Sequence, residues 1–362
     1  MTPKEKEILN EIKKNPSITQ GELADILNIS RSTVASHIKN LSDKGYILGR
    51  CYVVRDIPYI TVIGAANMDI IGSPEKNFIE RDSNIGTIYE TSGGVGRNIC
   101  ENLARLNLNV SFISIFGKDE RGKVILDELE KLGVDSEASF KIDGAPTSVY
   151  MAILDEKKDM YIAVNQMQIV DKFTPELIST KKNFIESSLI TVLDTNLSEE
   201  TLKYILNEIK QHYYVDAVSV NKCIKIKKML DKIYFLKANK KEAEYLSDVK
   251  ITDLSSCKKA ARTLMDTGLK TVCITLGENG VLYADNKNCI YKKAEKVDIV
   301  SASGAGDAFM AAYIYSNLKG YDIVRRLDFA SAASRLTLKS PKTISENLSV
   351  ENIEEEIKNV GN

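Results

Sequence analysis

The residues most able to do chemistry lie in Ser303–Phe309, a segment that reads Ser-Gly-Ala-Gly-Asp-Ala-Phe. Gly304 and Gly306 leave a turn without side chains, and the apolar spacing after it is typical of a buried helix. Free backbone N–H groups at a helix start attract anions, so this turn could hold a phosphoryl group. Asp307 is a carboxylate placed where it could take the proton from an attacking hydroxyl. The turn and the carboxylate together predict phosphoryl transfer from a nucleotide to an alcohol.

Two segments nearer the N-terminus could bind the alcohol. Asn67 and Asp69 follow an apolar run, and an amide and a carboxylate so close together can clamp the neighbouring hydroxyls of a diol. The alternative is a turn in which both side chains bond only to the local backbone. Gly93–Asn98 reads Gly-Gly-Val-Gly-Arg-Asn and enters a helical pattern. Its glycines could bring a ligand close to the backbone or could simply form a tight turn.

Two later segments could bind the nucleotide. Asn239 and Glu242 fall on one face of the first turn of a helix, where a carboxylate can orient water around Mg²⁺. The alternative is an N-cap asparagine followed by a stabilising acidic residue. Thr275–Gly280 lies between two strand-like runs and could wrap the phosphates or the adenosine of a nucleotide. Its alternative is a plain hairpin loop.

The composition narrows the class of protein that can carry these segments. A chain of 362 residues predicts two domains, or one large domain with an appendage. The 43% of hydrophobic and 27% of charged residues are typical of an ordinary globular protein. A net charge of −1 gives no overall attraction to nucleic acid or membrane, so any such binding must be local.

Cysteine and histidine usage excludes several kinds of site. The six cysteines are scattered without a C-x-x-C pair, which argues against a disulfide framework or a zinc site and favours the reducing cytoplasm. With only His37 and His212 available, a histidine metal cluster or a Ser-His-Asp hydrolase is not expected. The N-terminal residues lack the apolar core of a signal peptide, and no apolar run is long enough to predict a membrane span.

Residues 1–56 carry the pattern of a small helical domain. Apolar spacing predicts a first helix from about Pro3 to Lys14, and Pro16 ends it because proline lacks the N–H donor. Thr19 and Glu22 form a capping-box pattern for a second, shorter helix. That helix is expected to bury its apolar residues Leu23, Ile26 and Leu27.

A third helix, over residues 30–43, completes the pattern. Ser30 can cap it, Gly45 ends it, and Tyr46–Val54 then alternates as in a small hairpin. Three helices and a hairpin resemble the winged helix-turn-helix of bacterial regulators, with residues 30–43 as the recognition helix. Its outer face is small, polar and mildly basic, and supplies the expected DNA contacts: Arg31, Ser32, Thr33, Ser36, His37 and Lys39.

The charge of this domain leaves a second use open. Residues 1–50 hold eight Lys and Arg against six Asp and Glu, a small excess for a surface that must attract phosphates. Winged helices also serve as dimerisation or packing modules. DNA binding is the preferred interpretation, and a structural module is the alternative.

Residues 57–362 alternate strand-like and helical runs. This order predicts an α/β domain with a three-layer, doubly wound, mostly parallel sheet, whose ligands bind at the carboxyl ends of its strands. The expected strands are Tyr59–Ala65, Val110–Phe116, Leu189–Asp194, Tyr234–Lys237 and Val272–Leu276, and the expected helices include Val95–Leu106, Gly122–Leu132 and Lys240–Leu246. Segments of about 79–91 and 146–164 read as extended pieces without helices, and predict a small antiparallel β lid over the site.

Taken in order, these segments resemble the PfkB/ribokinase family of carbohydrate and nucleoside kinases from Tyr59 to the C-terminus. Gly93–Asn98 matches the family's first signature, Asn239–Glu242 its N-x-x-E motif and Ser303–Asp307 its G-A-G-D signature. Agreement of all three in order is far more specific than agreement of any one. Within the family the sequence of these motifs is most similar to that of the pseudouridine kinases, because general sugar kinases usually lack an arginine at the position of Arg97.

The resemblance implies a role for each matched residue. Asp307 would be the catalytic base for the ribose 5′-hydroxyl, and the N–H groups of Gly304, Ala305 and Gly306 would stabilise the transferring phosphoryl group. The implied nucleoside site consists of Asn67, Asp69, Gly93, Gly94, Arg97, Asn98, Asn165 and Met167, the last two and Arg97 near the uracil. The implied nucleotide site consists of Lys237, Asn239, Thr275, Gly277 and Gly280, with Glu242 holding the Mg²⁺ of ATP through water.

Three positions depart from the family pattern. Ser303 replaces a threonine and keeps its hydroxyl, and Ala238 stands where proline is common. Ser301 stands where family members often carry an aspartate, which leaves a requirement for a monovalent cation open. None of these positions is the base or the anion-binding turn.

The function predicted from the sequence is ATP-dependent phosphorylation of the 5′-hydroxyl of pseudouridine, without a membrane partner. Exposed lid edges also predict a homodimer, because such edges are often covered by pairing. Two alternatives stay open: a broader ribose or nucleoside kinase, and a ligand-sensing regulator whose kinase-like domain only binds the nucleoside. The intact Asp307 and Glu242 argue against the sensor, because binding alone needs no base.

Overall fold

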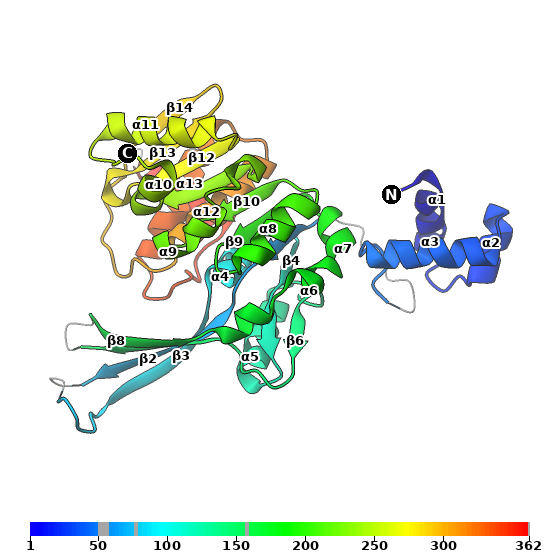
Figure 1. Ribbon diagram of the computed structural model, residues 1–362, viewed down its shortest axis with the longest axis horizontal. Helices are drawn as coiled ribbons and strands as arrows, with labels where there is room; N and C mark the ends of the chain where they lie inside the picture. Colours follow the sequence, from blue (N-terminus) through cyan, green and yellow to red (C-terminus); the bar gives the residue numbers. More distant parts are fainter. Residues whose placement is uncertain (50–57, 76–78, 156–158, 361–362) are drawn as a thin grey trace.

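The computed structural model describes residues 1–49, 58–75, 79–155 and 159–360, and shows a small helical domain beside a large α/β domain with a projecting sheet (Figure 1). The expected hairpin of the helical domain runs into residues 50–57, and the expected boundary between residues 56 and 57 falls there as well. Both therefore lie outside the described residues.

The helical domain forms as its capping signals predict. It consists of α1 (Pro3–Lys14), α2 (Gln20–Leu27) and α3 (Arg31–Asp43). The side chains of Thr2, Thr19 and Ser30 each accept a hydrogen bond from an N–H of the following helix. One prediction is wrong: Ile26 is 57% exposed, because the buried face of α2 runs through Leu23 and Ala24 instead. The core joins all three helices through Ile8, Leu9, Ile12, Leu23, Val34, Ile38 and Leu41.

The large domain is built on an eight-stranded sheet. Its order is β14 (Cys289–Lys292), β13 (Val281–Asp285), β12 (Thr271–Thr275), β11 (Phe235–Asn239), β10 (Tyr213–Asp216), β9 (Thr191–Asp194), β1 (Ile60–Ile63) and β4 (Val110–Ile113). The six strands from β12 to β4 are parallel, and β13 and β14 add an antiparallel edge. The expected mostly parallel sheet is thus confirmed.

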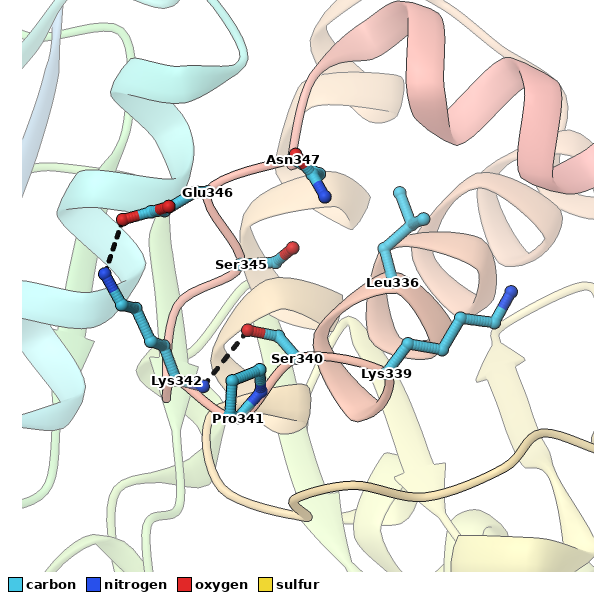
Figure 2. Close-up of a pocket in the computed structure, with 8 residues that line it drawn as sticks. All are labelled: Leu336, Lys339, Ser340, Pro341, Lys342, Ser345, Glu346 and Asn347. Atoms are coloured by element: carbon cyan, nitrogen blue, oxygen red, sulfur yellow. Dashed lines mark hydrogen bonds and ion pairs between the residues drawn. The ribbon is translucent and has the colours of Figure 1, made fainter.

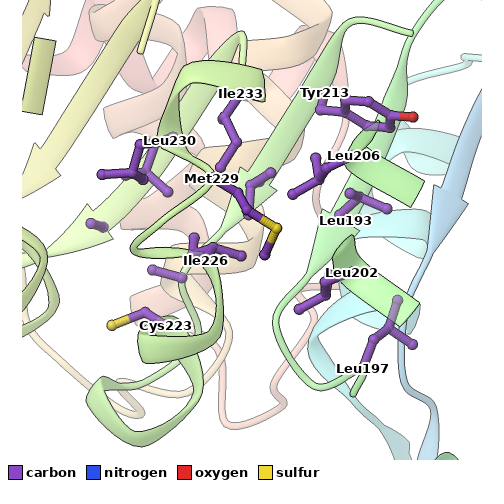
Figure 3. Packing of buried hydrophobic residues seen from close by; sticks show 14 of the residues in the cluster. Leu193, Leu197, Leu202, Leu206, Tyr213, Cys223, Ile226, Met229, Leu230 and Ile233 are labelled. Carbon is purple, nitrogen blue, oxygen red and sulfur yellow. The ribbon is translucent and has the colours of Figure 1, made fainter. Parts of the chain in front are cut away.

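Helices cover both faces of this sheet. One face packs against α4 (Val95–Arg105), α5 (Glu120–Lys131), α12 (Ala305–Leu318), α13 (Ile323–Leu338) and α14 (Val350–Val360). The other packs against α6 (Pro175–Ser179), α7 (Lys182–Glu186), α8 (Glu199–Glu208), α9 (Val220–Cys223), α10 (Lys240–Ser247) and α11 (Leu254–Asp266). Figure 3 shows part of this second core, where Leu202 and Leu206 of α8 lie beside Leu193 of β9.

The lid is a separate four-stranded sheet that projects from the domain (Figure 1). Its order is β3 (Gly86–Gly93), β2 (Asn67–Pro74), β7 (Val149–Leu154) and β8 (Met160–Gln166). Two details differ from the sequence prediction. β2 and β7 are parallel, so the lid is mixed rather than antiparallel. Asn67 and Asp69 begin a lid strand of their own, which the short gap after β1 had hidden.

Small elements complete the chain. β5 (Ile115–Gly117) pairs with β6 (Phe140–Ile142), and short 3₁₀ turns lie at η1 (Gln168–Lys172), η2 (Ile224–Ile226), η3 (Leu230–Lys232) and η4 (Gly277–Asn279). The two domains meet where Gly45, just after α3, packs against the ring of Phe184 on α7. Among the helices within the described ranges, none is both long and apolar enough to cross a membrane.

Candidate active site

A row of charged residues ends three neighbouring strands of the main sheet. Asp194 of β9 lies opposite Asp216 of β10, which lies opposite Lys237 of β11. Residues in register on parallel strands point to the same face, here the face that α4 and α12 cover. All three are buried, and Lys237 Nζ lies 3.0 Å from Asp216 Oδ2. Buried charges at the carboxyl ends of parallel strands mark the expected location of a site.

Two helix starts meet above this row. α4 begins at Gly94 with φ 101° and α12 at Gly304 with φ 77°, both in the left-handed region that favours glycine. Neither N-cap glycine has a side chain that could cap its helix. Within the described structure the first N–H groups of α12 therefore stay available to an anion, whereas the N–H of Gly96 in α4 is bound by the Asp194 carboxylate. Asn98, one turn into α4, donates through Nδ2 to Asp307 Oδ2 at 2.9 Å.

Close packing explains why the turn before Asp307 contains two glycines. A Cβ on Gly304 would overlap the carbonyl oxygen of Thr343, and a Cβ on Gly306 would lie 2.5 Å from Nζ of Lys237. The ammonium group of Lys237 therefore lies directly beneath the amides that are expected to bind the phosphoryl group. The sequence prediction assigned Lys237 to the nucleotide, and the structure places it between the turn and Asp216.

The environment of Asp307 suits a general base. The residue is 8% exposed, and burial together with the charge of Asp216 raises the pKa of its carboxyl group, against the opposing effects of Lys237 and the Asn98 amide. Burial lowers the pKa of Lys237, but the carboxylates of Asp216 and Asp307 outweigh it and raise that pKa. Lys237 is therefore a fixed positive charge, and Asp307 a carboxylate with increased affinity for a proton.

The residues expected to hold the sugar lie together at the base of the lid. The Asn67 amide donates to the Asp69 carboxylate, and Asn67 lies opposite Gly93 in the β2–β3 pair. A Cβ on Gly93 would overlap that carboxylate, so glycine is needed there. Burial raises the pKa of Asp69, while the Asn67 amide and the Arg97 charge lower it. Among the described residues the two side chains bond to each other and not to a local turn, and their binding of a diol stays a prediction.

A buried side-chain oxygen of Asn98 indicates a ligand in the expected sugar site. Oδ1 of Asn98 is buried and has no hydrogen-bond partner among the described residues. Because the Nδ2 of the same amide binds Asp307, this oxygen could accept a bond from a hydroxyl that lies beside the base. Asn98 thus connects the expected sugar site with the expected catalytic residue.

The three residues expected near the base of the nucleoside are placed differently from one another. Asn165 of β8 lies opposite Tyr150, which lies opposite Asp69, so Asn165 shares the lid face of Asp69. Met167 follows the end of β8 and is half-buried. Arg97 is buried and paired with two carboxylates, Glu101 at 2.7 Å and Glu128 at 3.0 Å, which leaves its buried Nε unpartnered.

The expected nucleotide residues end the next strands of the sheet. Asn239 closes β11 directly opposite Thr275, which closes β12. Gly277 begins the 3₁₀ turn η4, and Gly280 ends it before β13, so the hairpin considered as the alternative is formed. Hairpin and nucleotide binding are compatible, because the turn still lies at the carboxyl ends of β11 and β12.

Glu242 has the geometry of a cap. Its two carboxylate oxygens accept hydrogen bonds from the backbone and side-chain N–H groups of Asn239. Burial raises the pKa of Glu242, although the bond from Asn239 and the charge of Lys237 lower it. Each carboxylate oxygen has a second lone pair, so the cap does not prevent Glu242 from binding a metal-bound water.

The donor set fits Mg²⁺ that is bound mainly through phosphates and water. Within the described ranges, no three His, Cys, Asp or Glu side chains gather as a set that could hold a metal ion alone. Mg²⁺ keeps several waters and is often held by substrate phosphates, which asks only for a nearby carboxylate such as Glu242. The position of the usual family aspartate is filled by Ser301, whose hydroxyl accepts a bond from the N–H of Ser303.

A pocket of about 290 Å³ lies elsewhere, between the end of α13 and the loop that follows it (Figure 2). The predicted site residues are not among those that line it: Leu336, Lys339, Ser340, Pro341, Lys342, Ser345, Glu346 and Asn347. Lys342 is paired with Glu346 there. The same loop places the Thr343 carbonyl against Gly304, so it packs on the outside of the turn before Asp307.

Sequence reasoning did not select Asp194 and Asp216 as site residues. Each is a charged residue that ends an apolar strand, Thr191–Asp194 or Tyr213–Asp216. That signal was visible in the sequence.

The outer face of α3 carries the residues expected to contact DNA. Arg31, Ser32, Thr33, Ser36 and Lys39 are exposed, whereas His37 is half-buried and its Nδ1 has no partner among the described residues. The apolar residues Val34, Ile38 and Leu41 face the core. The helix therefore presents a polar surface to solvent, as a recognition helix requires.

Two family models match separate parts of the chain, one in the large domain and one in the helical domain. The model of the pfkB family carbohydrate kinases matches residues 58–349. A model described as winged helix-turn-helix DNA-binding matches residues 1–47.

Individual relatives extend this result. The chain is 34% identical over 355 residues to an uncharacterized sugar kinase, YeiI, of Escherichia coli, covering 97% of this chain and 98% of that protein. It is 33% identical over 302 residues to the pseudouridine kinase of Escherichia coli, covering 83% and 96%. A crystal structure of a putative sugar kinase from Clostridium perfringens is 32% identical, with a TM-score of 0.78 over 84% of this chain and 97% of that one.

Proposed function

We propose that this chain, which belongs to the pfkB family of carbohydrate kinases and has a ribokinase-like fold, transfers a phosphoryl group from ATP to the 5′-hydroxyl of pseudouridine. One observation carries the proposal. The hydrogen bond from Asn98 to Asp307 joins the helix of the expected sugar site to the helix that bears the expected base. A hydroxyl bound by Asn98 would therefore lie within reach of Asp307 and of the free amides of α12.

In this mechanism each residue has a distinct task. Asn67 and Asp69 hold the ribose 2′- and 3′-hydroxyls and so orient the 5′-hydroxyl. Asp307 accepts the proton of that hydroxyl as its oxygen attacks the γ-phosphorus, and the bond from phosphorus to the bridging oxygen breaks. The amides of Gly304, Ala305 and Gly306, with Lys237 beneath them, stabilise the charge on the phosphoryl group. Mg²⁺, held near Glu242 through water, would neutralise the charge of the phosphates.

The choice of pseudouridine rests on similarity and on the lid. The chain covers nearly all of the Escherichia coli pseudouridine kinase at 33% identity. Asn165 shares the lid face of Asp69, which supports a contact between Asn165 and a base attached to the bound ribose. A broader ribose or nucleoside kinase is the alternative, because the ribose clamp itself does not depend on the base.

A substrate panel tests the proposal. Initial rates with MgATP are measured for pseudouridine, uridine, ribose and fructose 6-phosphate, with Asp307→Asn as the inactive control. We expect the highest kcat/KM for pseudouridine. Faster turnover of another acceptor would leave the kinase activity standing and overturn the proposed specificity, whereas no turnover of any acceptor would overturn both.

We also propose that two copies pair through the lid face that lies opposite to Asp69. By strand register, Ile88, Met151, Ile162 and Val164 share that face, and all four are exposed. A contiguous exposed apolar surface of this kind favours association with a second copy. Light scattering should give a dimer for the chain and a monomer for Ile162→Glu, and a monomer for the unchanged chain would contradict the pairing.

DNA binding by the winged domain is the second proposed activity. The exposed polar face of α3 and the match of residues 1–47 to DNA-binding winged helices support it. In fluorescence anisotropy with DNA selected from a random duplex pool, Arg31→Ala and Lys39→Ala should weaken binding. Lys6→Ala, an equal change of charge on α1, should not. Equal weakening by all three would point to nonspecific attraction, and repetition with pseudouridine would show whether the ligand regulates binding.

A further inference from the structure

We propose that Asp194 is a positioning residue that locks the sugar-binding end of β1 to the first turn of α4. This inference rests on the proposed kinase activity, because it assigns a purpose to a residue of the same site. Asp194 is not expected to touch either substrate, because its side chain is fully buried. Its effect reaches the substrate through the two backbone segments that it joins.

The contacts of Asp194 connect three segments that are far apart in the sequence. Its Oδ2 accepts hydrogen bonds from the backbone N–H of Ala65 at 2.9 Å and of Gly96 at 2.8 Å. Its Oδ1 accepts one from the N–H of Asn196 at 2.8 Å. Ala65 lies just before the Asn67–Asp69 clamp, and Gly96 just before Asn98. One carboxylate oxygen thus sets the distance between the diol clamp and the residue that binds the catalytic base.

Glycines make this arrangement possible. A Cβ on Gly64 would lie 2.5 Å from Oδ2 of Asp194, and a Cβ on Gly96 would lie 2.8 Å from the same atom. The backbone of β1 and of α4 can therefore approach the carboxylate only because both positions lack a side chain. The first glycine signature of the chain serves this approach as well as the ligand.

An uncharged core could not replace this contact without loss. Removing the carboxylate would leave the N–H groups of Ala65 and Gly96 buried and unpaired, which costs stability for each group. Burial raises the pKa of Asp194, against the opposing effects of the Ala65 N–H bond, the backbone and side chain of Asn196 and the charge of Lys222. Asp194 also lies near Asp307 and its partners, which are the charged Asp216 and Lys237 and the neutral Asn98 amide.

The test compares Asp194→Asn and Asp194→Leu with Asp285→Asn. Asp285 accepts two backbone N–H bonds at 2.7 Å in a distant turn, so it controls for general loss of stability. We expect Asp194→Asn to raise the KM of the nucleoside about tenfold, on the scale of a misplaced binding group, with the KM of ATP unchanged. Asp194→Leu should be worse. The acid limb of kcat/KM should move to lower pH, because one negative charge near Asp307 is gone.

A readout without turnover keeps the inference separate from the proposed function. Hydrogen–deuterium exchange should become faster in peptides that contain Ala65 and Gly96 in Asp194→Leu, which has no acceptor for their N–H groups, and stay unchanged in Asp285→Asn. If no acceptor is phosphorylated by the unchanged protein, the kinase proposal fails while this measurement still tests Asp194. Unchanged exchange and an unchanged nucleoside KM in Asp194→Leu would overturn the positioning role, as would an equal loss in Asp285→Asn.

Discussion

The helices of the winged domain begin differently from α4 and α12, which start above the ends of β9, β10 and β11. This part of the large domain carries the proposed active site and is called the catalytic edge below. α1, α2 and α3 each start at a Thr or Ser side chain that accepts a bond from a first-turn N–H. α4 and α12 start at Gly94 and Gly304 and have no side-chain cap. A side-chain cap contributes about 1 kcal/mol to stability. Neither N-cap residue supplies that contribution. The N–H of Gly96 in α4 is instead bound by the distant Asp194 carboxylate, whereas the first amides of α12 have no partner among the described residues and remain available to a negatively charged ligand.

The same contrast holds for charge. In the winged domain the carboxylate of the buried Glu5 pairs with the ammonium group of Lys44 at 3.0 Å. It also accepts a hydrogen bond from the backbone N–H of Thr2 in its own capping box. At the catalytic edge three buried carboxylates, those of Asp194, Asp216 and Asp307, face one buried lysine. One region is therefore arranged for stability, and the other retains donors and charges that a substrate can use.

The largest effect on turnover is expected at Asp307, the proposed catalytic base. Asp307→Asn should reduce turnover at least ~10²-fold, because proton removal is lost, while nucleoside binding changes little. Single-turnover rates with MgATP and calorimetric titration with nucleoside would measure the two effects. The free energy of unfolding at neutral pH should rise, because a buried negative charge is removed. An active Asp307→Asn would refute the assigned role.

The next largest effect on turnover is expected at Gly304, in the turn before Asp307. Gly304→Ala should lower kcat about tenfold or more, because the turn must shift away from Thr343. It should also reduce the free energy of unfolding by roughly 1–3 kcal/mol through overpacking and strain. Gly133→Ala is the matched control: φ is 75° at Gly133 and 77° at Gly304, but a Cβ on Gly133 meets no atom within 4 Å. Equal losses of activity in both variants would contradict the steric explanation.

The raised pKa of Asp307 predicts how stability depends on pH. The folded state binds this proton more tightly than the unfolded state, so the group favours folding at low pH. That contribution is lost as pH rises from the ordinary aspartate range, about 4, through the raised pKa. Urea unfolding across this window should show a steeper fall of stability for the unchanged chain than for Asp307→Asn. Parallel curves would mean that the carboxyl group of Asp307 is not perturbed.

The smallest effect is expected at a cap of the winged domain. Ser30→Ala should cost about 1 kcal/mol of the stability of that domain, because the N–H of Thr33 loses its partner. Kinase activity should not change, since α3 lies outside the site. Thermal unfolding followed beside kinase rates would separate the two domains. A loss of turnover in Ser30→Ala would reveal coupling through the Gly45–Phe184 contact.

Signals that act within a few residues were readable from the sequence. The bounds of α1, the caps at Thr19 and Ser30, the glycine start of α12 and the strand–helix alternation all follow from neighbouring residues. The position of Ile26 was wrong because a short helix allows two buried faces and only packing selects one. β2 was missed because it begins within a few residues of β1 and belongs to another sheet.

Three features that the proposed chemistry uses can be read from the residue order alone: a carboxylate after a glycine turn, an amide–carboxylate pair and a helix that can be capped. Tertiary structure decided which of these meet. The alignment of Asp194, Asp216 and Lys237 depends on the register of β9, β10 and β11, and the bond from Asn98 to Asp307 joins residues 209 positions apart. Such contacts follow from the packing of whole layers, which no local pattern encodes.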